Sequence, residues 1–345
     1  MLASLMLMQG SAAPDLPKTV DARLQEAASD GFSGSVLVVH GGKSVLSKGY
    51  GFADPKAGRK VTPSTIFSIG SVTKWFTALV TLRLEQDGKL KLSDPIARLI
   101  DHVPADKRRI TIEQLLAHTA GLGDYIDRPG EGGDFAKIDR ATALKRILAE
   151  KLKFEPGTKT EYSNVGYTLL AMILEKASGQ SYEECVRNLI FKPAGMARSG
   201  FFGDRLWPED QFAIGQRAKT HGTRNMAYHW GPVTWSLKGA GGIVSTSEDL
   251  GKAVLALTQG KILSMANEPR MFRAVFEHEG YGWMVGRTAA GTPFCNVGGG
   301  DDFGFQAAIL YMPHEGDLVI TCSNSNTPEK MRVAIMDVLR TLEGG

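Results

Sequence analysis

The sequence predicts an α/β fold of the α+β type, in which an antiparallel sheet flanked by N- and C-terminal helices carries an inserted all-helical domain. Runs rich in β-branched residues occur near both ends of the chain, at 35–47 and again at 281–323. Between them, from about 96 to 200, apolar residues recur at helical spacing. Strands that bracket a helical middle indicate one sheet layer with a helical insertion.

Length and composition exclude several classes of protein. The chain has 345 residues, enough for one large domain or two ordinary ones. A net charge of +3 without a Lys/Arg stripe speaks against a nucleic-acid partner, and no internal apolar run is as long as a membrane span. The cysteines form no Cys-x-x-Cys pair, so we expect neither a disulfide framework nor a zinc site; they are Cys185, Cys295 and Cys322.

Residues 1–13 resemble the end of a secretory signal. A short apolar stretch leads to Ser11-Ala12-Ala13, a small-residue site of the kind that is cleaved, although no basic segment precedes it. If these residues are a signal remnant, we expect a periplasmic or secreted protein, and otherwise a cytoplasmic one.

The first third of the chain predicts two helices around a hairpin. Apolar spacing over 16–30, closed by Gly31, predicts the first helix. Two β-rich runs, 35–39 and 44–47, surround a turn and predict the hairpin. An extended approach at 67–70 then leads into a long helix that runs to about Gln86.

The middle of the chain is predicted to be helical. A capping box at Thr111–Gln114 begins a short helix, and further helices are expected near 141–152, 164–177 and 181–191. The Gly-rich segment 124–136 is a candidate rim for a cleft. Residues 199–237 carry aromatic side chains in irregular sequence, which fits a substrate-binding wall or an ordinary packed excursion equally well.

The last third returns to strands. A strand at 243–246 leads to a helix capped by Ser247, and strands are expected near 281–287, 293–297, 305–312 and 317–323. Thr327-Pro328 predicts the start of a terminal helix. We therefore expect a sheet domain formed by 14–95 and 236–345, a mainly helical domain formed by 96–235, and an active site in the cleft between them.

Ser71 and Lys74 are the first candidate catalytic residues. They lie three residues apart at the start of a predicted helix, so their side chains share one face. A serine hydroxyl becomes a nucleophile when a neighbouring desolvated amine takes its proton. The helix N-terminus adds N–H groups suited to a developing oxyanion. No other serine here has a lysine three residues on.

Two later stretches are candidate partners of this pair. Tyr162-Ser163-Asn164 is the only Tyr-x-Asn of the chain, and it directly precedes a predicted helix, where a plain Asn cap is the alternative. Asn296-Val297-Gly298-Gly299 lies at a late strand edge, where glycines let a ligand approach the backbone and a simple turn is the alternative. His118 is interpreted as a hydrogen-bonded structural residue in preference to a ligand or base.

Taken together and in this order, these stretches resemble the serine β-lactamase/penicillin-binding-protein superfamily. The resemblance is to its branch of class C β-lactamases, carboxylesterases and D-alanyl-D-alanine carboxypeptidase-like enzymes, and it covers about 18–342. It implies a β-lactamase/transpeptidase-like fold and a serine hydrolase that forms an acyl-enzyme. It also implies the roles of nucleophile for Ser71 and proton-sharing amine for Lys74.

The same resemblance implies roles for the other motif residues. Tyr162 matches the phenol that serves as base or relay in deacylation, and Asn164 matches the amide that orients the substrate and the lysine. Gly298 belongs to the third motif, and the N–H of Gly299 is expected in the oxyanion hole beside that of Ser71. Which of the lysine and the tyrosine is the base stays open, since the two titrate as a coupled pair.

Asn296 departs from the family pattern, which usually has a basic or aromatic residue there. Asparagine supplies no charge for a substrate carboxylate, so we expect weak selection for anionic β-lactams and a preference for neutral esters. On this basis Asn296→Lys should raise activity on an anionic β-lactam relative to a neutral ester.

The expected function is therefore a carboxylesterase acting on a small ester or amide. The alternatives are a β-lactamase, a D-amino-acid-specific peptidase, and an acylated sensor or binding protein without turnover. A Ser-His-Asp esterase would need a Gly-x-Ser-x-Gly elbow, and a metallo-hydrolase a His-x-x-x-His spacing, neither of which occurs. Nothing in the sequence requires a metal or organic cofactor. The oligomeric state stays open.

Overall fold

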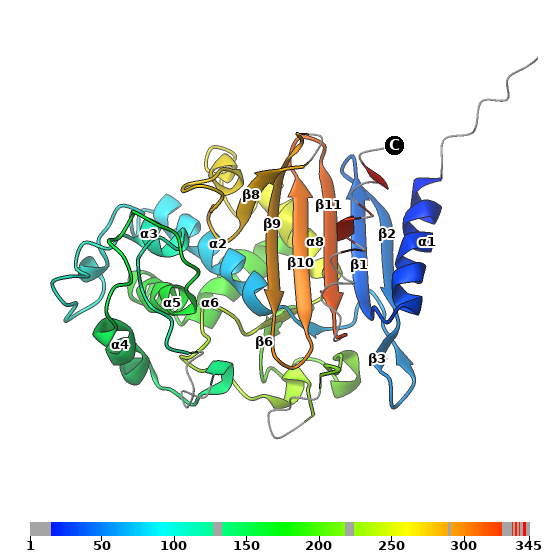
Figure 1. Cartoon of the computed structure of the whole chain (residues 1–345), viewed down its shortest axis with the longest axis horizontal. Helices are drawn as coiled ribbons and strands as arrows, with labels where there is room; N and C mark the ends of the chain where they lie inside the picture. Colours follow the sequence, from blue (N-terminus) through cyan, green and yellow to red (C-terminus); the bar gives the residue numbers. More distant parts are fainter. Residues whose placement is uncertain are drawn as a thin grey trace, which may run out of the picture.

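The computed structural model describes residues 15–126, 133–217, 224–288 and 291–325, together with Val333, Ile335, Met336, Val338, Thr341 and Leu342 near the C-terminus. Its centre is a six-stranded sheet in the order β2-β1-β11-β10-β9-β8, in which every neighbouring pair is antiparallel (Figure 1). The strands are β1 (Gly34–His40), β2 (Lys43–Tyr50), β8 (Met284–Arg287), β9 (Pro293–Gly300), β10 (Gln306–Met312) and β11 (Asp317–Ser323).

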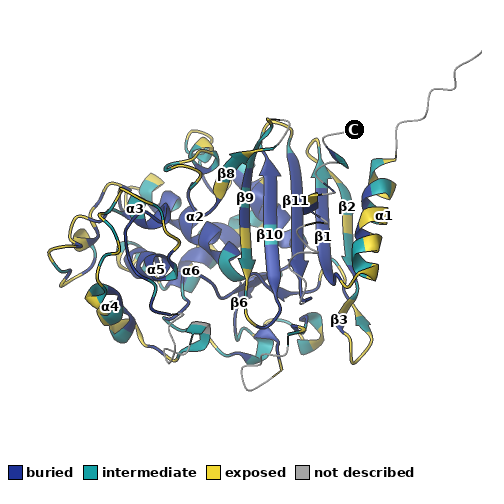
Figure 2. Cartoon of the chain, viewed as in Figure 1, coloured by how far each residue is buried: buried dark blue, intermediate teal, exposed yellow. Residues whose placement is uncertain are grey.

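The two faces of this sheet pack into two separate apolar cores. Helix α1 (Leu16–Ser29) covers one face, where Val36 and Val38 of β1 join its buried side chains. Leu37, between them, faces the opposite and larger core, because side chains alternate along a strand. Figure 2 shows the central strands β10 and β11 as buried, and exposed residues on the outer side of α1.

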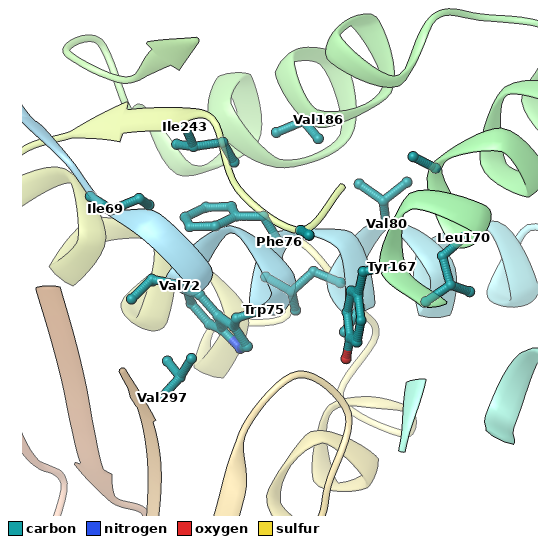
Figure 3. Packing of buried hydrophobic residues seen from close by; sticks show 14 of the residues in the cluster. Ile69, Val72, Trp75, Phe76, Val80, Tyr167, Leu170, Val186, Ile243 and Val297 are labelled. Atoms are coloured by element: carbon teal, nitrogen blue, oxygen red, sulfur yellow. The ribbon is translucent and has the colours of Figure 1, made fainter. Parts of the chain in front are cut away.

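Helix α2 (Thr73–Gln86) runs through the larger core. Its residues from Thr73 to Leu82 are all buried, so the helix has no solvent-facing side over that length. Some of the polar groups that this burial removes from water are bonded: Thr77 Oγ1, for example, donates to the carbonyl oxygen of Gly239 at 2.6 Å. Figure 3 shows the apolar side chains Val72, Trp75, Phe76 and Val80 packed around it. Groups at the start of α2 are therefore held rigidly.

The helical region lies beside one edge of the sheet (Figure 1). Its helices are α3 (Ile112–Leu116), α4 (Arg140–Ala149), α5 (Asn164–Ser178), α6 (Tyr182–Val186), a π-helical turn (Arg187–Phe191) and α7 (Lys192–Ala194). Helix α8 (Ser247–Thr258) packs against β1 and β11 on the face opposite α1. The predicted capping box of α3 is present, with Thr111 and Gln114 each bonding the other's backbone N–H.

Five short strands extend this architecture. A two-stranded sheet pairs β3 (Phe52–Asp54) with β4 (Arg59–Lys60). A three-stranded sheet orders β5 (Phe67–Ser68), β7 (Ile243–Ser245) and β6 (Gly200–Phe201), and it delivers the chain to the start of α2. The sequence did not predict β3, β4 or β6, because two- and three-residue strands leave no periodicity to detect.

The predicted fold class is confirmed: helices combine with an antiparallel sheet in the predicted order. Some boundaries differ. Strand β8 begins at Met284, not at 281, whereas β9 continues to Gly300. The cap of α8 is Thr246, whose side chain accepts from Asp249 N–H, and Ser247 is the first helical residue.

Some predicted features lie at the margins of the described chain. Residues 1–13, part of the Gly-rich segment (127–132) and the predicted helix start at Thr327-Pro328 lie outside the described residues. The described residues from Val333 to Leu342 are helical. The proposed domain boundaries stay a prediction. All three cysteines are free and buried.

Candidate active site

Ser71 lies in a single 3-10 turn, Gly70–Val72, that joins β5 to α2. The turn is fixed on both sides: Ile69 N–H donates to the carbonyl of Ile243 at 3.2 Å, and Val72 is fully buried under α2. The predicted strand-to-helix entry is thus present. It points the Ser71 hydroxyl into a small cavity while the backbone around it is immobilised by packing.

Lys74 holds its ammonium or amine group among three oxygen atoms. Its Nζ donates to Ser71 Oγ at 3.0 Å, to Asn164 Oδ1 at 2.8 Å and to the carbonyl oxygen of Ala240 at 3.0 Å. The residue is only 3% exposed, so these oxygens take the place of water around Nζ. These three hydrogen bonds fix the orientation of the Lys74 side chain, with Nζ directed at the oxygen of Ser71.

Tyr162 approaches the serine from the other side. Its hydroxyl donates to Ser71 Oγ at 2.7 Å, and Lys74 Nζ lies 4.7 Å from the centre of its ring. Although half of Tyr162 is exposed, its ring packs against buried His118 at a tilt of 33°, with 4.8 Å between ring centres. The serine oxygen is therefore bonded simultaneously to the lysine and to the tyrosine.

Asn164 is the first residue of α5, not its cap. Ser163 is the cap, because its side chain accepts from Gly166 N–H at 3.2 Å. This leaves the Asn164 amide available to Lys74, while its own N–H donates to Asp124 Oδ2 at 2.7 Å. The alternative of a plain Asn cap is wrong, and the helix terminus instead holds the amide in the site.

His118 packs against Tyr162 and bonds the backbone beside Asn164. Its Nδ1 accepts a hydrogen bond from Ser163 N–H at 3.1 Å, so the ring is neutral in this contact. Burial, followed by the charge of Lys74, lowers the pKa of His118 to about 3. The structure thus agrees with the interpretation of His118 as a hydrogen-bonded structural residue, which here positions Tyr162.

Strand β9 closes the site at Gly299. A Cβ on this residue would lie 2.4 Å from Ile69 O and 2.5 Å from Ser71 N, distances that no real side chain tolerates. At Gly298 the nearest such atom, Ala307 O, is 4.0 Å away. Gly299 is therefore a close-approach glycine that brings the strand backbone against the N–H of Ser71. This is where the family resemblance implies an oxyanion hole.

The register of β9 shows which of its side chains face α2. Val297 pairs with Ile309 and Asn296 with Leu310, and paired residues share a face of the sheet. Ile309 belongs to the core around α2, whereas Leu310 belongs to the core under α1. Val297 thus faces α2, and Figure 3 shows it below Val72 and Trp75.

Asn296 lies on the other face of β9, which it shares with Met284 of β8. Asn296 does line the cavity beside Ser71, but its Cβ emerges on the opposite face of β9 from Val297. The side chain that faces the catalytic helix is the apolar Val297. The expected effect of Asn296 on substrate choice stays a prediction, and β9 contains neither lysine nor arginine.

The cavity itself is small and has a mixed lining. It is bounded by Ser71, Lys74, His118, Tyr162, Glu279, Gly282, Trp283, Met284, Asn296, Val297 and Gly298. Sequence reasoning missed three contributors: Asp124, which holds Asn164; Ala240, whose carbonyl binds Lys74; and Glu279. No motif in the sequence marked the two carboxylates.

Other kinds of site are not apparent in the part of the chain that the structure describes. No group of three or more potential metal-binding side chains is found among those residues. No described helix is both long and apolar enough to cross a membrane.

Comparisons with known proteins agree with this geometry. Residues 18–342 match the family described as Beta-lactamase. The penicillin-binding protein PbpX of Bacillus subtilis (strain 168) is 35% identical over 243 residues, 70% of this chain and 59% of that protein. The teichoic acid D-alanine hydrolase of Staphylococcus aureus (strain MRSA252) is 31% identical over 248 residues, 72% of this chain and 59% of that protein.

Solved structures show the same fold. The octameric penicillin-binding protein homologue from Pyrococcus abyssi superimposes with a TM-score of 0.79 and 26% identity, covering 94% of this chain and 77% of that one. The chain spans 59% of the length of each of the two sequence relatives above.

Proposed function

The chain belongs to the Beta-lactamase family, and we propose that it is a serine hydrolase that cleaves small esters through an acyl-enzyme on Ser71. One observation carries the proposal: Ser71 Oγ lies 3.0 Å from Lys74 Nζ and 2.7 Å from the Tyr162 hydroxyl, on a helix that is buried all round. A nucleophile, a proton acceptor and a proton donor are thus within reach of one reacting carbon.

The partners of Lys74 favour it as the first proton acceptor. Asn164 Oδ1 and Ala240 O can only accept hydrogen bonds, so they occupy two N–H groups of Lys74. A neutral Lys74 therefore turns its lone pair towards the Ser71 hydroxyl. It takes the serine proton as Oγ bonds to the ester carbonyl carbon, and the resulting oxyanion lies against the Ser71 and Gly299 backbone.

Collapse of this intermediate forms the acyl-enzyme. The ester C–O bond breaks, and the leaving oxygen takes the proton of Tyr162 and departs as an alcohol. Tyr162 is then a phenolate whose charge is stabilised by the Lys74 ammonium, 4.7 Å from its ring centre. The phenolate next takes a proton from water, the hydroxide attacks the acyl carbon, and Ser71 Oγ leaves with the proton of Lys74. The products are an alcohol and a carboxylic acid.

The preference for esters without a carboxylate rests on the lining of the cavity. Lys74 is the one lysine or arginine among the described residues that line it, and its Nζ is already bonded to three oxygens. The strand residue facing the helix is Val297, which offers a carboxylate neither charge nor hydrogen bond. The name of the Staphylococcus aureus relative, a D-alanine hydrolase, supports a role in removing small acyl groups.

The test compares a short-chain p-nitrophenyl ester with a chromogenic cephalosporin, using wild type and Ser71→Ala. We expect ester hydrolysis that disappears in the variant, and little cephalosporin cleavage. Ester hydrolysis that survives in Ser71→Ala would refute the assignment of the nucleophile. Rapid cephalosporin turnover would refute the ester preference and make the protein a β-lactamase.

A further inference from the structure

One carboxylate in the catalytic cavity has no part in the mechanism above. Glu279 lines the same cavity as Ser71 and Tyr162. It lies in the turn that precedes β8, where its N–H donates to Phe276 O and its carbonyl accepts from Val275 N–H, both at 2.7 Å. These bonds fix the backbone of Glu279, and hence the direction in which its side chain leaves the turn.

The same turn is anchored to the catalytic helix. Gly282 packs so closely on α2 that a Cβ there would lie 2.8 Å from Lys74 O and from Trp75 Cα. Next to it, the ring of Trp283 stacks on Trp75 with 5.4 Å between ring centres. Tyr281 extends the anchor by donating to Glu113 Oε1 at 2.5 Å. The position of Glu279 relative to Ser71 is therefore set by rigid contacts.

The Glu279 carboxylate lacks a partner within the described chain. It forms no hydrogen bond or ion pair with any residue that the structure describes, although it is half-buried. This burial raises the pKa of the Glu279 carboxyl, with Glu277 adding to the effect and His278 opposing it. A desolvated carboxylate without a partner is unfavourable, and a bound cation would remove the penalty.

The charges around the cavity favour a positively charged partner for Glu279. His118 is neutral, Val297 is apolar, and Lys74 is bonded to Ser71, Asn164 and Ala240. A substrate carboxylate would meet Glu279 with no cation to offset the repulsion. A substrate ammonium would instead find a carboxylate beside the nucleophile.

We propose that Glu279 binds the free ammonium group of the substrate, and that the substrates of the Ser71 site are aminoacyl esters or amides with an unblocked amino group. This inference rests on the proposed hydrolase function and specifies its substrate class. In an α-aminoacyl ester, the ammonium is one carbon from the carbonyl that Ser71 attacks. Within one cavity, Glu279 would therefore bind the ammonium group of a small acyl unit, and Ser71 would attack the adjacent carbonyl carbon. Glu279 acts as a specificity residue, and the proton transfers remain with Lys74 and Tyr162.

The experiment uses the full chain and two pairs of probes. The methyl esters of D- and L-alanine carry an ammonium, whereas their N-acetyl derivatives are neutral and have the same reacting bond. We expect wild type to prefer the ammonium ester of its favoured enantiomer by about tenfold or more in kcat/KM, the usual scale of a charge-assisted hydrogen bond. Glu279→Gln should abolish this preference through a higher KM for the ammonium ester.

Two further variants complete the design. Glu277→Gln removes a carboxylate from the same turn, but its side chain is exposed and does not line the cavity, so the preference should persist. Glu279→Asp keeps the charge and should retain part of the preference. Thermal unfolding of all three variants checks that the turn is intact.

The outcomes separate this inference from the function on which it rests. A lack of Ser71-dependent hydrolysis of any of the esters would overturn both. Ser71-dependent hydrolysis with equal kcat/KM for ammonium and neutral esters would overturn the ammonium site alone. An equal fall of kcat for both esters in Glu279→Gln would also overturn it, because that result would make Glu279 a proton-transfer group.

Discussion

Replacing Gly299 by alanine tests the contact on which the proposed oxyanion hole depends. The new methyl group would lie 2.4 Å from Ile69 O and 2.5 Å from Ser71 N, whereas ordinary contacts begin at 3.4 Å. Strand β9 and the Ser71 turn must therefore separate by roughly 1 Å. All the atoms that the methyl group meets are backbone, so no flexible side chain can move aside to relieve the clash.

The size of the effect follows from that displacement. A misplacement of about 1 Å can cost about a hundredfold in rate, and removal of one oxyanion donor costs about 10²–10³ in kcat. We therefore expect kcat for a p-nitrophenyl ester to fall at least about a hundredfold in Gly299→Ala. Overpacking should also lower the free energy of unfolding by about 1–3 kcal/mol, so activity is measured well below the melting temperature.

Gly298→Ala is the matched control. It makes the same chemical change one residue away, where the nearest atom is Ala307 O at 4.0 Å. We expect its kcat and melting temperature to stay close to those of wild type. If Gly299→Ala retained activity within about threefold of wild type, β9 would not form part of the oxyanion hole and this reasoning would be refuted.

The remaining predictions concern the other faces of the site. Tyr162→Phe should lower kcat by about 10²–10⁴ without unfolding the protein, since it removes the hydroxyl that bonds Ser71. Stopped-flow kinetics measures the acylation rate of this variant, and a rate equal to that of wild type would contradict the prediction. Asn296→Lys should raise activity on an anionic cephalosporin relative to a neutral ester by about tenfold, because Asn296 lines the cavity beside Ser71; an unchanged activity ratio would contradict this. The pKa of His118 falls from 6.5 to about 3 on folding, so between pH 6.5 and pH 3 the unfolded chain binds a proton at His118 that the folded protein does not. The free energy of unfolding is therefore highest above pH 6.5 and decreases as the pH falls through this range. Between pH 7 and pH 5 the decrease in the free energy of unfolding is about 2 kcal/mol. Denaturant titrations of His118→Asn should lack this decrease; the same pH dependence as in wild type would contradict the prediction.

The fold and the centre of the site were predictable because they depend on local patterns. The Ser71–Lys74 spacing acts within one helical turn, and the Tyr162–Asn164 pair is fixed by a helix start. Each of these relations spans three residues or fewer. The structure then needed only to bring two such units together, which the family resemblance implied.

The orientation of β9 could not be predicted in the same way. A shift of one residue in strand register exchanges its two faces, and Asn296-Val297-Gly298-Gly299 contains too little apolar alternation to specify which face is buried. Only the pairing of Val297 with Ile309 resolves it. The sequence pattern therefore identified a strand that lines the cavity, but not which of its side chains face α2.

Glu279 and Asp124 were missed for a different reason. Each reaches the site through a loop whose path depends on distant contacts, such as the packing of Trp283 on Trp75. A single carboxylate in a loop carries no periodicity and no motif. The place of such residues in the site becomes visible only in the folded structure.

The most direct test of the account is the mass of the intact protein during turnover of a slowly hydrolysed p-nitrophenyl ester. We predict a transient increase equal to one acyl group, located by proteolysis on the peptide that contains Ser71 and absent in Ser71→Ala. Turnover without any such adduct, or an adduct on a different residue, would contradict the claim that Ser71 is the nucleophile of an acyl-transfer enzyme.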